Sequence, residues 1–276
     1  MKPNTETASA PTIGLFWPSW TLWRREIVRF LRQRSRVIGA LGTPLVFWLL
    51  IGGGLGRSFK LPGVDASMSY LEYTYPGAIG AILLFTSIFS MISIIDDRRE
   101  GFMQGVLVAP VSRLAIVLGK VSGATTLAVA QAVLFLALAP VAEISLSMIS
   151  VIATVGAMVL VALAVTSLGF WMAWRMESVQ GFHAVMNLVL MPMLVLSGAF
   201  FPPEGSATLI RWVVNLNPMT YAIALIRQAM YFGSGPGHLS GQVGLPVAFG
   251  VSVLFAAVML GLSVKVATNK TSNVSQ

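Results

Sequence analysis

The sequence predicts an all-α membrane protein with six transmembrane helices, an N-terminal interfacial amphipathic helix, and outer re-entrant helices between spans 5 and 6. Its mean hydropathy is +0.80, and 56% of its residues are hydrophobic whereas only 10% are charged. A soluble domain carries about 25% charged residues, so this chain cannot cover a globular surface of ordinary polarity. Long apolar stretches consume most of its 276 residues, which indicates one membrane domain.

Six apolar stretches are each long enough to cross the hydrocarbon core of a bilayer, which takes roughly 17–25 helical residues. They lie at 37–56, 76–95, 114–138, 147–174, 184–201 and 246–266. The chain is therefore expected to comprise a cytoplasmic N-terminus with an interfacial amphipathic helix (1–36), a six-span domain (37–266) and a cytoplasmic tail (267–276).

The distribution of Lys and Arg predicts the orientation of the spans. Most of the 18 basic residues precede the first span, follow the second or fourth span, or lie near the C-terminus. The opposite side holds only Arg57, Lys60, Arg211 and Arg227. Because basic residues are retained on the cytoplasmic side, we expect both termini in the cytoplasm and the chain in the inner (plasma) membrane. Topological anchoring then accounts for the net charge of +8, and no nucleic-acid partner is expected.

The segment before the first span has the pattern of an amphipathic helix. Aromatic and aliphatic residues share one helical face, namely Phe16, Trp20, Trp23, Ile27 and Phe30. Arginines occupy the opposite face, namely Arg25, Arg29, Arg32 and Arg36. We expect the aromatic face to dip into lipid and the arginines to face headgroups and cytosol. The helix is then either a simple anchor or a contact surface for a partner.

The long connection between the fifth and sixth spans, residues 202–245, contains two shorter apolar stretches. They lie near 206–216 and 219–232, on either side of Asn217-Pro218. Stretches of this length are too short to cross a bilayer and are typical of re-entrant or interfacial helices. We expect this segment to pack against the bundle on its outer side.

The sequence excludes several kinds of chemistry. It contains no GxxxxGK[ST] phosphate-binding loop. Gly119-Lys120 matches the central pair, but Leu114 stands where the first glycine is required and Val121 stands where Ser or Thr is required. His183 and His238 stand alone, so neither a metal site nor another cofactor is expected. The middles of the spans offer only mild polarity, as at Gln131, Thr166 and Asn187, whereas ion-coupled carriers hold charged groups there. These absences predict a protein that is not an enzyme and takes any energy from a partner.

The connection between the second and third spans, residues 96–113, has the pattern of a short amphipathic helix. It opens with alternating charges, continues with apolar residues on one face and stops at Pro110. The apolar residues are Phe102, Met103, Val106 and Leu107. Such a helix suits docking into a groove on another protein, although its apolar face could equally rest on the bilayer.

Three motifs, in the same order along the chain, carry a resemblance to ABC-2 type transporter permeases. The first runs from Tyr75-Pro76-Gly77 through Glu100-Gly101 and Ala109-Pro110-Val111-Ser112-Arg113 to Gly119-Lys120. The second, which resembles an N-terminal interfacial helix, is Trp23-Arg24-Arg25-Glu26-Ile27-Val28-Arg29-Phe30-Leu31-Arg32. The third, which resembles an outer re-entrant segment, joins Ser197-Gly198-Ala199-Phe200-Phe201-Pro202 to Leu216-Asn217-Pro218-Met219-Thr220-Tyr221.

The resemblance implies a homodimer of this chain bound to two copies of a separate ABC ATP-binding subunit, within the lipid bilayer. The interfacial helix and the 96–113 connection would contact that ATPase. The implied coupling positions are Asp97, Arg98, Glu100, Gly101, Phe102, Val106 and Leu107 in the connection, with Glu26 and Arg29 in the interfacial helix.

The function expected from these features is that of the permease subunit of an ATP-driven exporter for a hydrophobic or amphipathic substrate, such as a drug or a lipid. Alternatives are the permease of a lipid-linked saccharide exporter, an ABC importer subunit, and a channel or scaffold without ATP coupling. Candidate substrate-pathway residues are Phe85, Phe89, Asn187 and Phe200. Aromatic residues in spans also serve simple helix packing or lipid contact.

Overall fold

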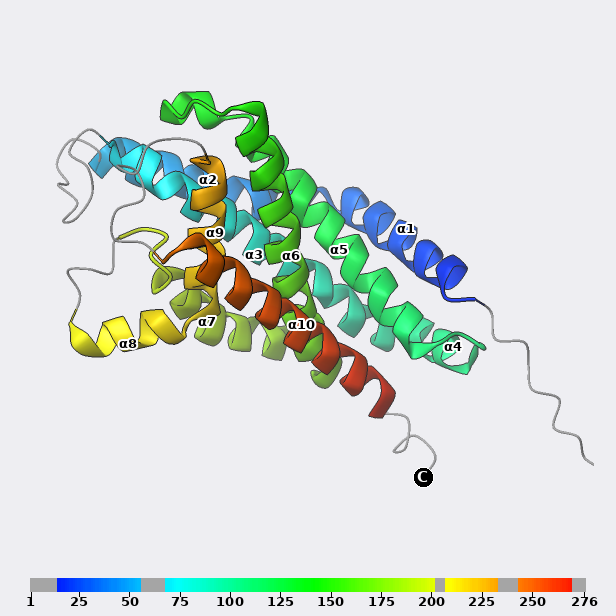
Figure 1. Cartoon of the computed structure of the whole chain (residues 1–276). Coiled ribbons are helices and arrows are strands. Elements are labelled where there is room, and N and C mark those ends of the chain that lie inside the picture. Colours follow the sequence, from blue (N-terminus) through cyan, green and yellow to red (C-terminus); the bar gives the residue numbers. More distant parts are fainter. Residues whose placement is uncertain (1–13, 56–67, 202–206, 233–242, 270–276) are drawn as a thin grey trace, which may run out of the picture.

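A computed structural model of the chain describes residues 14–55, 68–201, 207–232 and 243–269, and within these ranges every regular element is a helix (Figure 1). The elements are α1 (Phe16–Arg32), α2 (Arg34–Leu55), α3 (Tyr70–Arg99), α4 (Phe102–Val108), α5 (Arg113–Leu136), the 3-10 helix η1 (Ala139–Ala142), α6 (Met148–Arg175), α7 (Val179–Val195), α8 (Thr208–Leu216), α9 (Pro218–Met230) and α10 (Leu245–Asn269). The prediction of an all-α protein is confirmed.

The 30-residue helix α3 forms the core of the bundle. Most of its residues are buried, because α2, α5, α6, α7 and α9 all pack against it. Side chains such as Tyr75 and Ile79 have no exposed surface. By contrast, α10 packs mainly on α6 and α9 and exposes Val247, Phe249 and Leu254. A helix that is apolar all round and exposed along one side is suited to lipid contact.

Serine residues define where four of the helices begin. Ser69, Ser112, Ser147 and Ser178 are the N-caps of α3, α5, α6 and α7, and each hydroxyl accepts a hydrogen bond from the backbone three residues later. Such caps satisfy amides that have no partner inside the helix. They fix the starts of the helices, which apolar composition alone leaves undefined.

Four described helices are long and apolar enough to cross a membrane: α3, α5, α6 and α10. The pair α8 and α9 would make a fifth if the two counted as one broken span, although they are bent by 75° at Asn217. The apolar part of α2, Val37–Leu50, and the 17-residue α7 are shorter. The chain is therefore a multi-pass membrane protein.

The break between α8 and α9 is organised by one side chain. The amide nitrogen of Asn217 donates to the carbonyls of Met193, at 2.6 Å, and Leu196, at 3.1 Å, at the end of α7. Its amide oxygen accepts from the backbone of Met219, at 3.0 Å, and caps α9. Asn217 thus closes one helix and starts another. The predicted fifth span extends to residue 201, whereas α7 ends at Val195, before the left-handed turn at Gly198.

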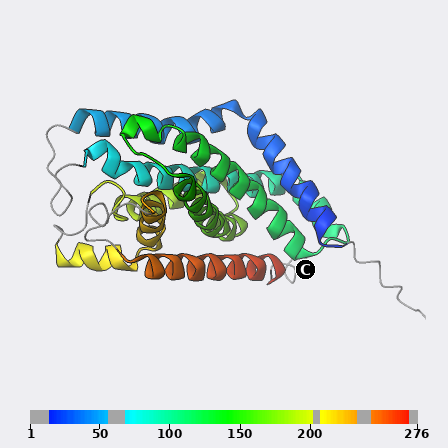
Figure 2. The same cartoon turned by 45° about the horizontal axis from the view of Figure 1, so that its top comes forward.

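The helix predicted before the first span is present as α1, but its orientation differs from the prediction. Figure 2 shows α1 and α2 meeting at an angle, with α1 lying along α5. Phe30 is buried, and Arg25 and Arg29 point toward the end of α3. The expected division into a lipid-facing aromatic face and a solvent-facing arginine face is therefore wrong for these three residues. Trp20 is half exposed, and the side chain of Arg36 lies outside the described residues.

The start of α1, the helix α4 and the end of α10 lie at one end of the bundle, and α8 lies at the other (Figures 1 and 2). Most of the predicted C-terminal tail, residues 270–276, lies outside the described residues, as do Arg57 and Lys60.

Candidate functional site

The contact between α1 and α5 depends on two glycines. A Cβ atom at Gly119 would lie 2.7 Å from the Cβ of Leu22 and 2.8 Å from the carbonyl oxygen of Ser19. A Cβ atom at Gly123 would lie 2.9 Å from the Cβ of Glu26. Small residues spaced by four let membrane helices approach closely. The close approach brings the carboxylate of Glu26 within reach of α5.

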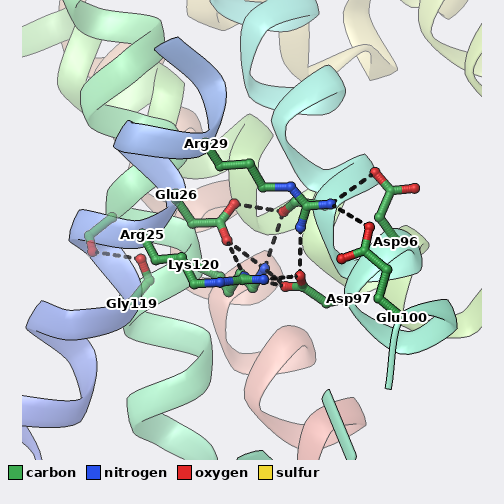
Figure 3. Close-up of polar contacts among 10 residues, drawn as sticks. Arg25, Glu26, Arg29, Asp96, Asp97, Glu100, Gly119 and Lys120 are labelled. Atoms are coloured by element: carbon green, nitrogen blue, oxygen red, sulfur yellow. Dashed lines mark hydrogen bonds and ion pairs between the residues drawn. The ribbon is translucent and has the colours of Figure 1, made fainter. Parts of the chain in front are cut away.

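Lys120, between these glycines, is fully buried and binds acidic residues from two other helices (Figure 3). Its ammonium lies 2.6 Å from Glu26 Oε1 on α1 and forms a second, short ion pair with Asp97 on α3. It also donates to the hydroxyl of Ser93, at 3.2 Å, which itself donates to Glu26 Oε2, at 2.6 Å. Every group in this contact is therefore satisfied by protein atoms, as burial requires.

Two arginines of α1 complete the arrangement around Asp97. Arg25 binds both carboxylate oxygens, at 2.6 and 2.9 Å, and Arg29 binds Oδ1 at 2.5 Å. Arg29 also reaches Asp96 at 3.5 Å and Glu100 at 3.4 Å. Together, Arg25, Glu26, Arg29, Asp96, Asp97, Glu100 and Lys120 form what we call the charge cluster (Figure 3). It joins α1, α3 and α5.

The electrostatics around Arg25 favour its ion pair with Asp97. Burial disfavours the charged form of Arg25, but the hydrogen bond to Asp97 and the surrounding negative charges outweigh this effect and raise the pKa of its guanidinium. Removing one partner of a buried ion pair typically costs about 3–5 kcal/mol, because the other charge stays buried. The cluster therefore holds α1 to α3 and α5 as one unit.

The short helix α4 lies at the surface of the unit formed by α1, α3 and α5. It begins at Phe102, after a left-handed residue at Gly101 (φ 77°), where a side chain would be strained. The guanidinium of Arg25 lies 3.7 Å from the centroid of the Phe102 ring, a cation–π contact. The predicted short helix in this connection is confirmed, and it ends at Val108, before Pro110.

An apolar groove with a volume of about 520 Å³ separates α4 from the first half of α1. Its lining consists of Trp17, Pro18, Thr21, Leu22, Phe102, Gly105, Val106, Ala109 and Val111. Val108, beside the groove, is 88% exposed. Grooves of this kind can accommodate apolar anchor residues of another protein.

The predicted coupling residues differ in how deeply the structure buries them. Asp97 and Glu26 have side chains exposed by 0% and 4%, so they lie inside the chain, whereas the Glu100 side chain is 62% exposed. Arg29 is partly buried in the charge cluster, and Arg98 turns toward α6. The remaining members are partly exposed at α4: Gly101, Phe102, Val106 and Leu107. Their contact with an ATPase stays a prediction.

The predicted substrate-pathway residues also divide. Phe85 and Phe89 on α3 stack with their ring centroids 6.0 Å apart, and Phe89 lies 5.9 Å from the ring of His183 on α7. Asn187, one turn further along α7, is exposed. Phe200 lies apart from this group, next to Phe47 of α2 at 6.2 Å.

A second buried cation lies toward the opposite end of α3. Arg227 of α9 donates to the carbonyl oxygens of Tyr73, at 3.1 Å, and Gly198, at 3.4 Å. Its guanidinium lies 4.3 Å from the centroid of the Tyr73 ring. The Tyr73 hydroxyl in turn donates to the carbonyl of Gly198, at 3.2 Å. We call these three residues the Arg227 cluster; it holds the turn after α7 against α3 and α9.

The sequence does not predict the central role of Lys120 and Arg25. Lys120 contributes only to the distribution of basic residues that predicts orientation, and Arg25 is expected to face headgroups and cytosol. The available signal was the pair of glycines around Lys120, because Gly-x-x-x-Gly in an apolar helix marks a helix-packing face. In the described ranges, no group of three or more acidic or histidine side chains could hold a metal ion.

The fold and this site define a helical, multi-pass membrane protein in which a short surface helix is tied to the bundle by buried charges. The chain belongs to the ABC-2 type transporter family, whose model matches residues 19–231. It is therefore a transport permease by family.

Relatives extend over most of the chain. It is 27% identical over 231 residues to the "Putative transport permease ycf38" of Cyanophora paradoxa, covering 81% of this chain and 78% of the relative. It is 25% identical over 261 residues to "Nodulation protein J" of Rhizobium meliloti (strain 1021), covering 92% and 95%. The "Nodulation protein J" of Neorhizobium galegae is 27% identical over 233 residues, covering 82% and 86%.

Proposed function

We propose that this chain is the membrane subunit of an ATP-driven exporter, in which two copies of the chain bind two copies of a separate ATP-binding subunit. The observation that carries this proposal is the surface made by α1 and α4. It offers an apolar groove beside the exposed carboxylate of Glu100, and it rests on a buried charge cluster. A partner that docks there pushes on a rigid support.

The residues of this surface suit a docking contact because they combine apolar area with charge. Phe102 and Val106 line the groove, and Val108 lies exposed beside it. Interfaces gain their affinity from desolvated apolar anchors and their selectivity from charges at the rim. In this arrangement, Glu100 would pair with a basic group of the ATPase, whereas Asp97 and Glu26 would support the surface from within.

We further propose six spans, with both termini in the cytoplasm of the inner (plasma) membrane. In addition to the four long helices, α2 and α7 would each cross the membrane; they are apolar over 14 and 17 residues. The bent pair of α8 and α9 would be re-entrant on the outer side. This arrangement puts α4 and the end of α10 on one side of the membrane, in keeping with their common end of the bundle.

The proposed cargo is hydrophobic or amphipathic. The aromatic group of Phe85 and Phe89 lies beside α7, whose outer side exposes Leu188, Val189 and Met191. A pathway of this composition favours apolar ligand surface. A second copy of the chain facing α2 and α7 would enclose it.

The proposed partner is tested with tagged chain purified from its native membrane. We expect a polypeptide with a GxxxxGK[ST] loop to co-purify at one copy per permease, and vanadate-sensitive ATP hydrolysis by the reconstituted complex. Glu100→Lys should lower that hydrolysis by about tenfold or more, since a charge reversal at an interface costs several kcal/mol. The matched control is Glu143→Lys, the same change at the exposed residue that ends η1. Unchanged hydrolysis with Glu100→Lys would contradict the assignment of this surface.

The topology is tested by single cysteines, because the chain has none of its own. Ser206 and Ser234, in the connection after α7, lie outside the described residues, so exposed described positions are used instead. Glu143→Cys and Asn215→Cys should react with an impermeant thiol reagent added to intact cells. Gln104→Cys and Glu177→Cys should react only after permeabilisation. The reverse pattern at any one position would overturn the six-span arrangement.

A further inference from the structure

The last turn of α3 reaches two different parts of the bundle. Asp97 turns toward α1 and α5, where it binds Arg25 and Lys120. Its neighbour Arg98 turns toward the end of α6. Its two terminal nitrogens donate to the backbone carbonyls of Trp174, at 2.9 Å, and Met176, at 3.0 Å.

The chemistry of this contact is that of a helix C-terminus. The last carbonyls of a helix have no partner within the helix, and they carry the negative end of its dipole. A guanidinium satisfies both needs, because it is charged and has several donors in one plane. The Arg98 guanidinium also lies 5.6 Å from the centroid of the Trp174 ring.

The contact lies between two helices of functional interest. On one side, Arg98 comes four residues before the start of α4, and the turn between them is fixed by the bond from the Glu100 amide to the carbonyl of Asp96, at 2.9 Å. On the other side, Met176 comes three residues before the start of α7, which Ser178 caps. A displacement of α4 can therefore reach α7 through one side chain and a few backbone bonds.

We propose that Arg98 is a positioning residue that links the motion of α4 to the first turn of α7. The proposal rests on the proposed function, because it takes the ATPase as the source of that motion. It assigns to Arg98 a role inside the permease, distinct from the direct contact with the ATPase that the sequence predicted. The aromatic group near α7 would respond to ATP through this link.

The test compares hydrogen exchange in two segments of the purified complex with its ATPase, with and without trapping by ADP and vanadate. The segments are 102–108, which is α4, and 176–183, which covers the connection before α7 and the first turn of α7. In the wild type, we expect trapping to change exchange in both segments by about twofold or more, as for elements that open and close together. In Arg98→Gln, the response should persist in 102–108 and be lost in 176–183.

Two further variants separate positioning from general stability. Arg99→Gln, the same change at the exposed neighbouring residue, should respond like the wild type. Arg98→Lys keeps the charge but not the fork of donors, so its response in 176–183 should be intermediate. If the Arg98→Gln complex does not assemble, Arg98→Lys alone is compared with the wild type. If Arg98 were merely structural, replacing it would raise hydrogen exchange in 176–183, but that exchange would still depend on nucleotide.

The possible failures are distinguishable. If no ATP-binding subunit co-purifies, the proposed function falls first. If trapping changes segment 102–108 in the wild type and leaves 176–183 unchanged, the link through Arg98 is wrong and the proposed function stands. An undiminished response of 176–183 in Arg98→Gln and Arg98→Lys would also overturn the link.

Discussion

The charge cluster and the Arg227 cluster contact opposite ends of α3 and bind a buried cation in different ways. Lys120 is paired with carboxylates from two other helices, whereas Arg227 donates to two backbone carbonyls. Both clusters fasten a segment to α3. The first places opposite charges inside the bundle, so each depends on the others; the second holds a turn through polar groups that carry no formal charge.

The comparison shows that burial alone does not decide how much a cation matters. A lost partner is most costly where a full opposite charge remains buried. An unpaired carbonyl costs less, roughly 1–3 kcal/mol. Removal of Lys120 should therefore cost more than removal of Arg227, although both residues are almost completely buried.

The largest expected effect is that of Lys120→Met, which leaves Glu26 and Asp97 without their shared cation. We expect the free energy of unfolding in mixed micelles to fall by about 3–5 kcal/mol. The control is Lys265→Met, at an exposed position of α10. Adding Glu26→Gln to Lys120→Met should recover part of the loss, because it removes the carboxylate that has lost its cation. Asp97 still retains its two arginines. Equal stability of Lys120→Met and Lys265→Met would show that the cluster does not hold α1.

A smaller loss is expected for Arg227→Gln, about 2–3 kcal/mol in the same measurement, because two carbonyls lose their donor. Arg24→Gln, at an exposed position of α1, serves as the control and should be close to neutral. If Arg227→Gln proved more destabilising than Lys120→Met, then the difference between carboxylate and carbonyl partners would not explain the two clusters.

The smallest expected effect comes from the close backbone approaches near each cluster. Gly119→Ala should cost about 1–3 kcal/mol, since the new Cβ meets Ser19 backbone and Leu22. Gly77→Ala should also be destabilising, because its Cβ would collide with the backbone of Ala199. Gly156→Ala, where the space around the Cβ is open, should be neutral or slightly stabilising. A neutral Gly119→Ala would mean that α1 is held by charge alone.

Sequence patterns predicted the helices best where apolar composition and a capping residue agree. The expected stretches 114–138 and 147–174 differ from α5 and α6 by at most two residues at either end, and both helices begin after a serine. The end of α7 was missed, because it depends on Gly198 adopting a left-handed conformation and on Asn217 closing the helix from a distant position. No local pattern contains that contact.

The candidate site was predicted in part, for a related reason. The short helix α4 follows from its apolar face and from Gly101 and Pro110. The contacts between helices in the charge cluster join partners that are 23 to 94 residues apart in the sequence. A period along one helix shows which side is polar, but it does not show that Arg25 and Arg29 face the end of another helix.

The distance in sequence between Glu26 and Lys120 has a consequence for biogenesis. The 94 residues that separate them take about 5–20 seconds to synthesise at ordinary rates of translation. Throughout that interval, α1 has emerged from the ribosome while the cation for Glu26 is still missing. The nascent helix must keep this carboxylate hydrated at the membrane surface until α5 is inserted. Docking of α1 is thus expected late in assembly, although α1 precedes the other described helices in the chain.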